Sequence, residues 1–158
     1  MRDNDFVTDE DCLVQLPNFD LVAQHLQPLA VGLMAAQIQQ LSPAALAYLG
    51  DTVYELYIRT NYLLPPKRAH HYHQLVVEQV RAETQALHLA SLTPHLNATE
   101  LEIVRRGRNT AKHSRRVNPE IYQQATSLET LIGYLYLTDL PRLSQLLKKL
   151  SLAVDAEE

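Results

Sequence analysis

Two carboxylates beside glycines are the residues of this sequence best suited to chemistry. Asp51 directly follows Gly50, and Glu129 lies one helical turn before Gly133, so each acid sits where another backbone can approach closely. No cysteine accompanies either acid, because the chain has one cysteine, Cys12. Oxygen ligands without thiolates are what Mg²⁺ prefers, and Mg²⁺ keeps waters that can attack phosphorus. The pair therefore indicates a metal-dependent phosphodiesterase.

Only a fold could bring these acids together, because 78 residues separate them in the sequence. The first acid is predicted on a helix that begins at Pro43, with the Ser42 hydroxyl as its cap. Apolar residues recur there at helical spacing: Leu46, Leu49, Val53 and Leu56. The alternative is an ordinary solvent-exposed stripe, made of Tyr48, Asp51, Glu55 and Arg59.

The second acid is predicted on a helix that begins at Asn118 and Pro119, a cap followed by a proline at the first helical position. Its apolar stripe consists of Ile121, Ala125, Leu128, Ile132 and Leu135. Glu129 lies at the edge of that stripe. The alternative is a new helix starting at Thr126, because the segment 126–129 also matches a capping box.

The remaining pattern is helical as well, which predicts an all-α protein. A helix is expected from residues 67–70 to about 91, a short one after the capping box at 97–100, and an amphipathic one over 142–152. A length of 158 residues, 46% hydrophobic content and 4 glycines fit one mostly helical domain. His70, His71 and His73 lack the spacing of a helical zinc site.

The densest basic stretch, residues 105–116, holds six Lys or Arg and no acid. Gly107, Asn109 and Ser114 within it suit a loop whose amides and guanidinium groups contact phosphates. A solvated basic loop is the alternative. Residues 1–40 carry six acids against one arginine, whereas residues 41–152 carry thirteen Lys or Arg against nine acids. The body could therefore bind a polyanion.

The N-terminus is acidic where a signal peptide would be basic, and no apolar run reaches the length of about 20 residues that spans a bilayer. A single cysteine cannot form an internal disulfide. A soluble, cytoplasmic protein without a membrane partner is expected.

Two segments resemble the ribonuclease III family. Residues 46–56, LAYLGDTVYEL, look like its signature helix, and residues 128–137, LETLIGYLYL, look like its second acidic helix. Residues 38–150 together resemble the small bacterial branch called Mini-ribonuclease III, which lacks the double-stranded-RNA-binding domain. The resemblance implies an all-α helical bundle like the ribonuclease III endonuclease domain. It divides the chain into an acidic N-terminal extension (1–37), a catalytic domain (38–152) and a C-terminal tail (153–158).

The resemblance assigns Asp51 and Glu129 as catalytic residues that bind Mg²⁺. Glu55 is expected to support them without binding the metal directly. Two further acids of full-length ribonuclease III are replaced here, by Ala47 and Thr126, so water must fill more of the metal's coordination shell. The residues expected to bind RNA are Arg105, Arg106, Arg108, Asn109, Lys112, Arg115 and Arg116.

The implied protein is a homodimeric, Mg²⁺-dependent endoribonuclease that cleaves double-stranded RNA. The implied substrate is the precursor of 23S ribosomal RNA, and a ribosomal protein that shapes this substrate is a further candidate partner. One competing hypothesis is a non-catalytic, dimeric RNA-binding protein with a degenerate ribonuclease III fold. A weaker one is a helical protein-interaction domain.

Overall fold

The computed structural model describes residues 32–111 and 118–152, and every regular element within those ranges is a helix. The elements are α2 (Ala35–Gln40), α3 (Pro43–Asn61), α4 (Ala69–Val80), α5 (Ala82–Leu92), η2 (Thr93–His95), α6 (Ala98–Thr110), α7 (Pro119–Thr138) and α8 (Leu140–Leu147). The all-α prediction is confirmed. None of the helices in these ranges has the length and apolar character needed to cross a membrane.

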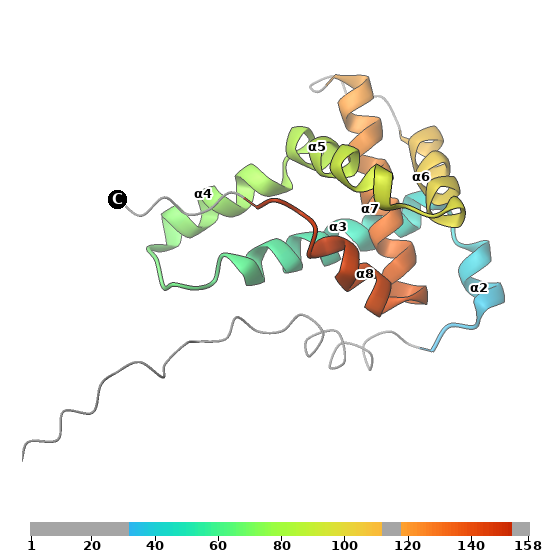
Figure 1. The fold of residues 1–158 in the computed structure, drawn as a ribbon, viewed down its shortest axis with the longest axis horizontal. Helices are drawn as coiled ribbons and strands as arrows, with labels where there is room; N and C mark the ends of the chain where they lie inside the picture. Colours follow the sequence, from blue (N-terminus) through green and yellow to red (C-terminus); the bar gives the residue numbers. More distant parts are fainter. Residues whose placement is uncertain (1–31, 112–117, 153–158) are drawn as a thin grey trace, which may run out of the picture.

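Two long helices, α3 and α7, cross at the centre of the molecule (Figure 1). The crossing is close because each helix offers a glycine to the other. A Cβ on Gly50 would collide with the backbone carbonyl of Glu129, and a Cβ on Gly133 would collide with that of Leu46. The backbones therefore touch at this point, as Gly50 had predicted.

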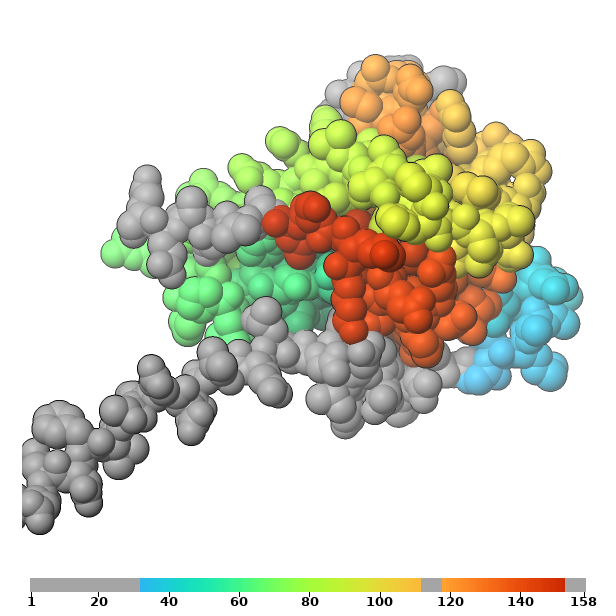
Figure 2. All heavy atoms as spheres, in the orientation of Figure 1, coloured from blue at the N-terminus to red at the C-terminus, as the bar shows by residue number. Residues whose placement is uncertain are grey.

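Most of the remaining helices pack around α7, which contacts α2, α3, α5, α6 and α8. On the face seen in Figure 2, α8 lies against the segment of α5 and η2. The Arg142 guanidinium of α8 donates to the His95 carbonyl of η2 at 2.7 Å and to the Glu100 carboxylate of α6 at 2.7 Å. Glu100 is 2% exposed and the Arg142 side chain is 25% exposed, so this ion pair lies at the edge of the core.

The helix starts predicted at Ser42, Asn97 and Asn118 are confirmed, whereas the helix predicted over 142–152 runs over Leu140–Leu147, because the Asp139 side chain caps it and Pro141 lies in its first turn. The Ser42 hydroxyl accepts from the Ala45 N–H, Asn97 and Glu100 form a capping box, and the Asn118 side chain accepts from the N–H of the second residue of α7. Because α7 continues from Pro119 to Thr138, no new helix starts at Thr126.

The prediction of one helix from residues 67–70 to about 91 is wrong. Arg81 is extended, with φ −68° and ψ 152°, and separates α4 from α5. Side chains of α5 satisfy the carbonyls left open at the end of α4: the Thr84 hydroxyl donates to Glu78 and the Gln85 amide to Val80. The break lets α4 pack on α3 while α5 packs on α7, which one straight helix could not do.

Candidate functional site

The crossing of α3 and α7 brings the two predicted acids together. Asp51 directly follows Gly50 in α3, and Gly50 packs against the backbone carbonyl of Glu129 in α7. The negative charge of Asp51 acts on the Glu129 carboxyl, as expected for neighbouring acids. Because the two helices touch backbone to backbone at this point, both carboxylates lie near the crossing of α3 and α7.

The pKa values of both acids are raised in this setting. Burial, and after it the charge of Asp51, raises the pKa of the half-buried Glu129 to about 7, against an opposing hydrogen bond from Gln85. Burial and the charge of Glu55 raise the pKa of Asp51. A bound cation would remove this penalty, because opposite charge favours the ionised form of a carboxyl group.

The donor set fits Mg²⁺ better than a transition metal. Two carboxylates provide hard oxygen ligands, and Mg²⁺ is often held by one or two carboxylates while keeping several waters. Across residues 32–111 and 118–152, no group of three His, Cys, Asp or Glu side chains could hold a metal ion. A cation here would take Asp51, Glu129 and water.

The two positions where the resemblance implied missing acids lie in the helix packing. Ala47 is 6% exposed and Thr126 is 8% exposed. The Thr126 carbonyl accepts from the Thr130 hydroxyl at 2.7 Å, so its backbone is tied within α7. These positions supply no carboxylate, so within the described ranges the helix crossing brings together Asp51 and Glu129, with Glu55 one turn beyond Asp51.

Glu55 lies one turn beyond Asp51 on α3 and faces partly to solvent. Its carboxylate accepts from Arg59 Nε at 3.0 Å. Its charge reaches Asp51, because it contributes to the raised pKa of that acid. Glu55 is therefore placed to influence Asp51, with its own charge shared with an arginine.

The basic stretch begins as a helix, which corrects the predicted loop. Helix α6 continues through Thr110, and Gly107 is buried against α7, where a Cβ would lie 2.5 Å from Thr130 Oγ1. The glycine thus serves helix packing. The sequence pattern misled because Gly and Asn also mark turns.

The cations of this stretch have different surroundings. Arg105 is paired with Glu102, its Nε donating at 2.8 Å, whereas Arg108 Nε approaches the Gln123 amide oxygen at 3.5 Å. Among the residues that the structure describes, no salt bridge joins a carboxylate to Arg106 or Arg108, although the charge of Arg106 acts on Glu102. Asn109 is exposed. The other three predicted RNA contacts, Lys112, Arg115 and Arg116, lie outside the described residues.

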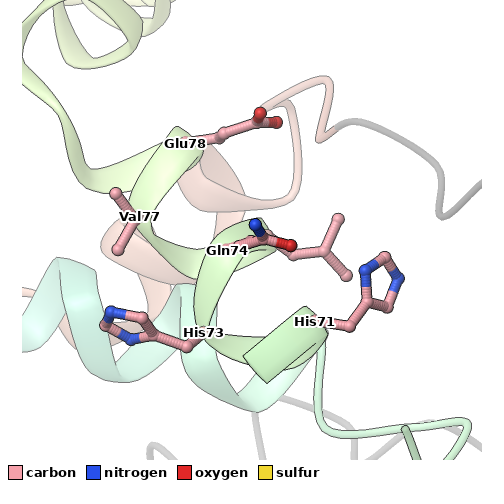
Figure 3. A pocket seen from close by; sticks show the side chains of 6 residues that line it. His71, His73, Gln74, Val77 and Glu78 are labelled. Atoms are coloured by element: carbon pink, nitrogen blue, oxygen red, sulfur yellow. The ribbon is translucent and has the colours of Figure 1, made fainter. Parts of the chain in front are cut away.

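Two histidines of α4 line a recess that does not include the acids. A recess of about 450 Å³ on α4 is lined in part by His71 and His73, which point to opposite sides of the helix (Figure 3). Neither Asp51 nor Glu129 lines it.

Gln85 is the neighbour of the site that sequence reasoning missed. It is 2% exposed on α5, and its side chain acts on Glu129. The signal was available, because Gln85 is a polar residue on the face that also carries Ala82, Ala86 and Leu89.

Comparison with known proteins gives consistent matches. Residues 44–140 match the ribonuclease III domain family. The chain is 58% identical over 119 residues to Mini-ribonuclease 3 of Synechocystis sp., covering 75% of this chain and 83% of that one. It is 59% identical to Mini-ribonuclease 3 of Synechococcus sp., covering 75% and 86%. Protein FN1578 of Fusobacterium nucleatum has a similar structure, with a TM-score of 0.62, 28% identity and coverage of 71% and 95%.

Proposed function

Because the chain belongs to the Mini-ribonuclease 3 group of the ribonuclease III family and is an endoribonuclease, we propose that it cleaves double-stranded RNA with Mg²⁺ held by Asp51 and Glu129. One observation carries the proposal. The crossing of α3 and α7 sets two carboxylates side by side, where each is harder to ionise without a cation.

The proposed reaction is hydrolysis of one phosphodiester bond, leaving a 5′-phosphate. When bound, Mg²⁺ supplies positive charge at the reacting oxygens and an activated water. Asp51 and Glu129 hold and orient the cation through their carboxylate oxygens. The backbone contact at Gly50 keeps the two helices from sliding, so the acids stay at a fixed spacing.

The C-terminal half of α6 is the proposed contact with the RNA backbone. Neither Arg106 nor Arg108 forms a salt bridge in the described part of the chain, although the charge of Arg106 acts on Glu102. Asn109 beside them is exposed. Lys112, Arg115 and Arg116 extend the same basic sequence. Duplex RNA is recognised mainly through phosphates, 2′-hydroxyls and shape, which such a surface suits.

A homodimer is proposed because α3 carries apolar side chains on its outer face. Tyr48 is 84% exposed and Leu56 is 45% exposed, although both lie on the helix that holds Asp51. Pairing α3 with its copy across a two-fold axis would bury them. It would also set two cleavage centres along one duplex.

The proposed substrate is the paired end region of the 23S ribosomal RNA precursor, which would place the enzyme in the cytoplasm. An assay on the naked precursor and on precursor bound to ribosomal proteins tests whether a protein must first shape the RNA. Cleavage of neither form, with cleavage of other duplexes, would exclude this substrate.

The deciding experiment measures cleavage of a labelled RNA duplex at low salt with Mg²⁺. Asp51→Asn and Glu129→Gln should bind the duplex and fail to cut it. Glu120→Gln, an exposed acid of the same helix α7, is the matched control and should cut like the parent. If Asp51→Asn and Glu129→Gln cut at the parent rate, these acids do not form the active site. If the parent binds duplexes without cutting any, the non-catalytic hypothesis holds instead.

A further inference from the structure

Two adjoining recesses lie beside the short helix α2. One, of about 310 Å³, is lined in part by Leu33 and Leu137. The other, of about 430 Å³, is lined in part by Leu46 and by Arg106 of α6. The residues that line both are Ile38, Gln39 and Tyr134. The two recesses therefore belong to one surface, the α2 groove, which leads from the start of the described chain to the basic half of α6.

The wall of the α2 groove is largely apolar. Ile103 of α6 contributes to it, and Ile38 is the one buried residue of α2, which contacts α7. Leu33 on the rim is 39% exposed, and Met34 next to it is 69% exposed. Exposed apolar side chains around a recess indicate a surface that binds another apolar segment.

The α6 end of the groove is positively charged. Arg106 lines it and Arg108 follows two residues later, and neither forms a salt bridge within the described ranges. Glu102 also lines the groove, but its carboxylate accepts from Arg105 Nε at 2.8 Å, and the charge of Arg106 acts on it. An occupant that suits the whole groove is therefore apolar along most of its length and acidic at its far end.

Residues 1–31 have this composition in the matching order. The part nearest the groove, residues 13–31, contains nine Leu, Val or Phe residues and one acid. Residues 1–12 contain five acids and one arginine. The described chain begins at Gly32, beside the Leu33 that lines the groove, so residues 13–31 start at the groove. Length is no obstacle, because 31 residues can span roughly 100 Å, whereas α6 is about 20 Å long.

We propose that residues 1–31 occupy the α2 groove, with residues 13–31 on its apolar wall and the acids of residues 1–12 over Arg106 and Arg108. The acids then compete with RNA for the same two arginines. Exposed ion pairs are weak singly, but a tethered segment has an effective concentration of about millimolar, so weak pairs suffice to lower RNA affinity. The competition rests on the proposed function, because it needs α6 to contact RNA, whereas the docking does not.

The one cysteine of the chain provides the first test. Cys12 lies at the junction of the acidic and apolar parts, so a nitroxide attached to it broadens nuclear magnetic resonance signals close to the docked segment. In the 158-residue chain the amide signal of Arg106 should broaden. That of Val77 should not, because α4 lies at the opposite end of the molecule from α6 (Figure 1). Cys12→Ser treated with the same reagent should show no broadening. Equal broadening at Arg106 and Val77, or none at Arg106, overturns the docking.

Two variants of the whole chain separate docking from the general effect of charge. The first combines Phe19→Ser, Val22→Ser and Leu26→Ser, which removes apolar contacts and leaves the net charge unchanged. The second replaces the five acids of residues 1–12 by their amides. Both should lose the broadening at Arg106 and bind duplex RNA without metal about 3- to 10-fold more tightly at low salt. Leu87→Ser is the matched control, because Leu87 is a 70% exposed leucine of α5 outside the groove, and it should change neither readout.

The outcomes distinguish this proposal from the function on which it rests. If Arg106 broadens in the parent and both variants bind RNA with the parent's affinity, the segment does not compete and the inference is wrong, while cleavage at Asp51 and Glu129 is unaffected. If only the amide variant binds RNA more tightly, its net charge explains the gain and the competition is again wrong. If Arg108→Ala binds RNA as tightly as the parent, the proposed α6 contact itself fails.

Discussion

Replacing Gly50 with alanine should destabilise the protein and disable the site together. The added Cβ would collide with the carbonyl oxygen of Glu129 and would lie 2.7 Å from the Gly133 nitrogen. Both obstacles are backbone atoms of α7, so no side-chain rotation can relieve the contact. The two helices must move apart at the point where they hold the acids.

The magnitude follows from two opposing effects. Alanine improves helix propensity over glycine by about 1 kcal/mol. Overpacking in a tight interior costs about 1–3 kcal/mol and more when backbone must shift. We expect a net loss of about 2 kcal/mol or more in the free energy of unfolding of Gly50→Ala. Separating the helices by about 1 Å should also lower the cleavage rate by about 100-fold.

The glycines of this chain form a graded control series. No atom lies within 4 Å of the point that a Cβ on Gly32 would occupy, so Gly32→Ala should leave stability and cleavage unchanged. At Gly107 a Cβ would lie 2.5 Å from Thr130 Oγ1, 2.8 Å from Thr130 Cβ and 3.0 Å from Ser127 Cα. Rotation of the Thr130 hydroxyl relieves only the first contact, and no carbonyl oxygen is met head-on as at Gly50, so Gly107→Ala should fall between the two. Urea unfolding and single-turnover cleavage measure both effects. A Gly50→Ala variant within about 0.5 kcal/mol of the parent would refute the backbone contact.

Three further perturbations test the charges of the molecule. The pKa of Glu129 is raised from 4.5 to about 7 in the native state, so between pH 4.5 and pH 7 the native state holds a proton that the unfolded state has lost. The metal-free chain should therefore lose about 3 kcal/mol of stability as the pH rises through this range. Glu129→Gln should remove that loss in urea titrations at pH 5 and pH 8; an unchanged slope contradicts the assignment. Arg142→Leu should cost about 2 kcal/mol at pH 7, since the buried Glu100 loses its charged donor and keeps only the Asn97 N–H. Arg142 lowers the pKa of Glu100, so the pair's contribution is present above the usual glutamate pKa and is lost on acidification; a cost as large at pH 3 would contradict this. Arg108→Ala should reduce the salt dependence of duplex binding by about one unit in log–log slope, more than Arg105→Ala, because Arg105 is paired with Glu102; equal slopes would count against the α6 contact.

Features set by neighbouring residues could be predicted from the sequence. Ser42, Asn97 and Asn118 start helices through hydrogen bonds that span two or three residues, so the residue types alone identify them. The close approach at Gly50 was also predictable, because glycine inside a helix is unfavourable unless another backbone needs the space.

Features set by tertiary packing could not be predicted in the same way. Nothing local forbids a helix through Arg81; it breaks there because α4 and α5 must face different partners, α3 and α7. Gly107 was interpreted as a loop residue because its packing partner, Thr130, is distant in the sequence. In the sequence, Gln85 is only a polar residue on an apolar helix face. Its effect on the pKa of Glu129 could not be predicted, because Glu129 lies on another helix.

The number of acids at the helix crossing affects how easily each of them ionises. Each additional carboxylate at this crossing would raise the pKa of its neighbours further, as Asp51 does for Glu129. An amide donor favours the ionised carboxylate without adding negative charge, and Gln85 acts on Glu129 in that sense. Ala47 and Thr126 are buried in the helix packing and add no charge. The Gln85 side chain, which lowers the pKa of Glu129, also donates to the Val80 carbonyl at the end of α4. The feature that local patterns failed to predict, the extended residue between α4 and α5, is the one that makes this hydrogen bond available.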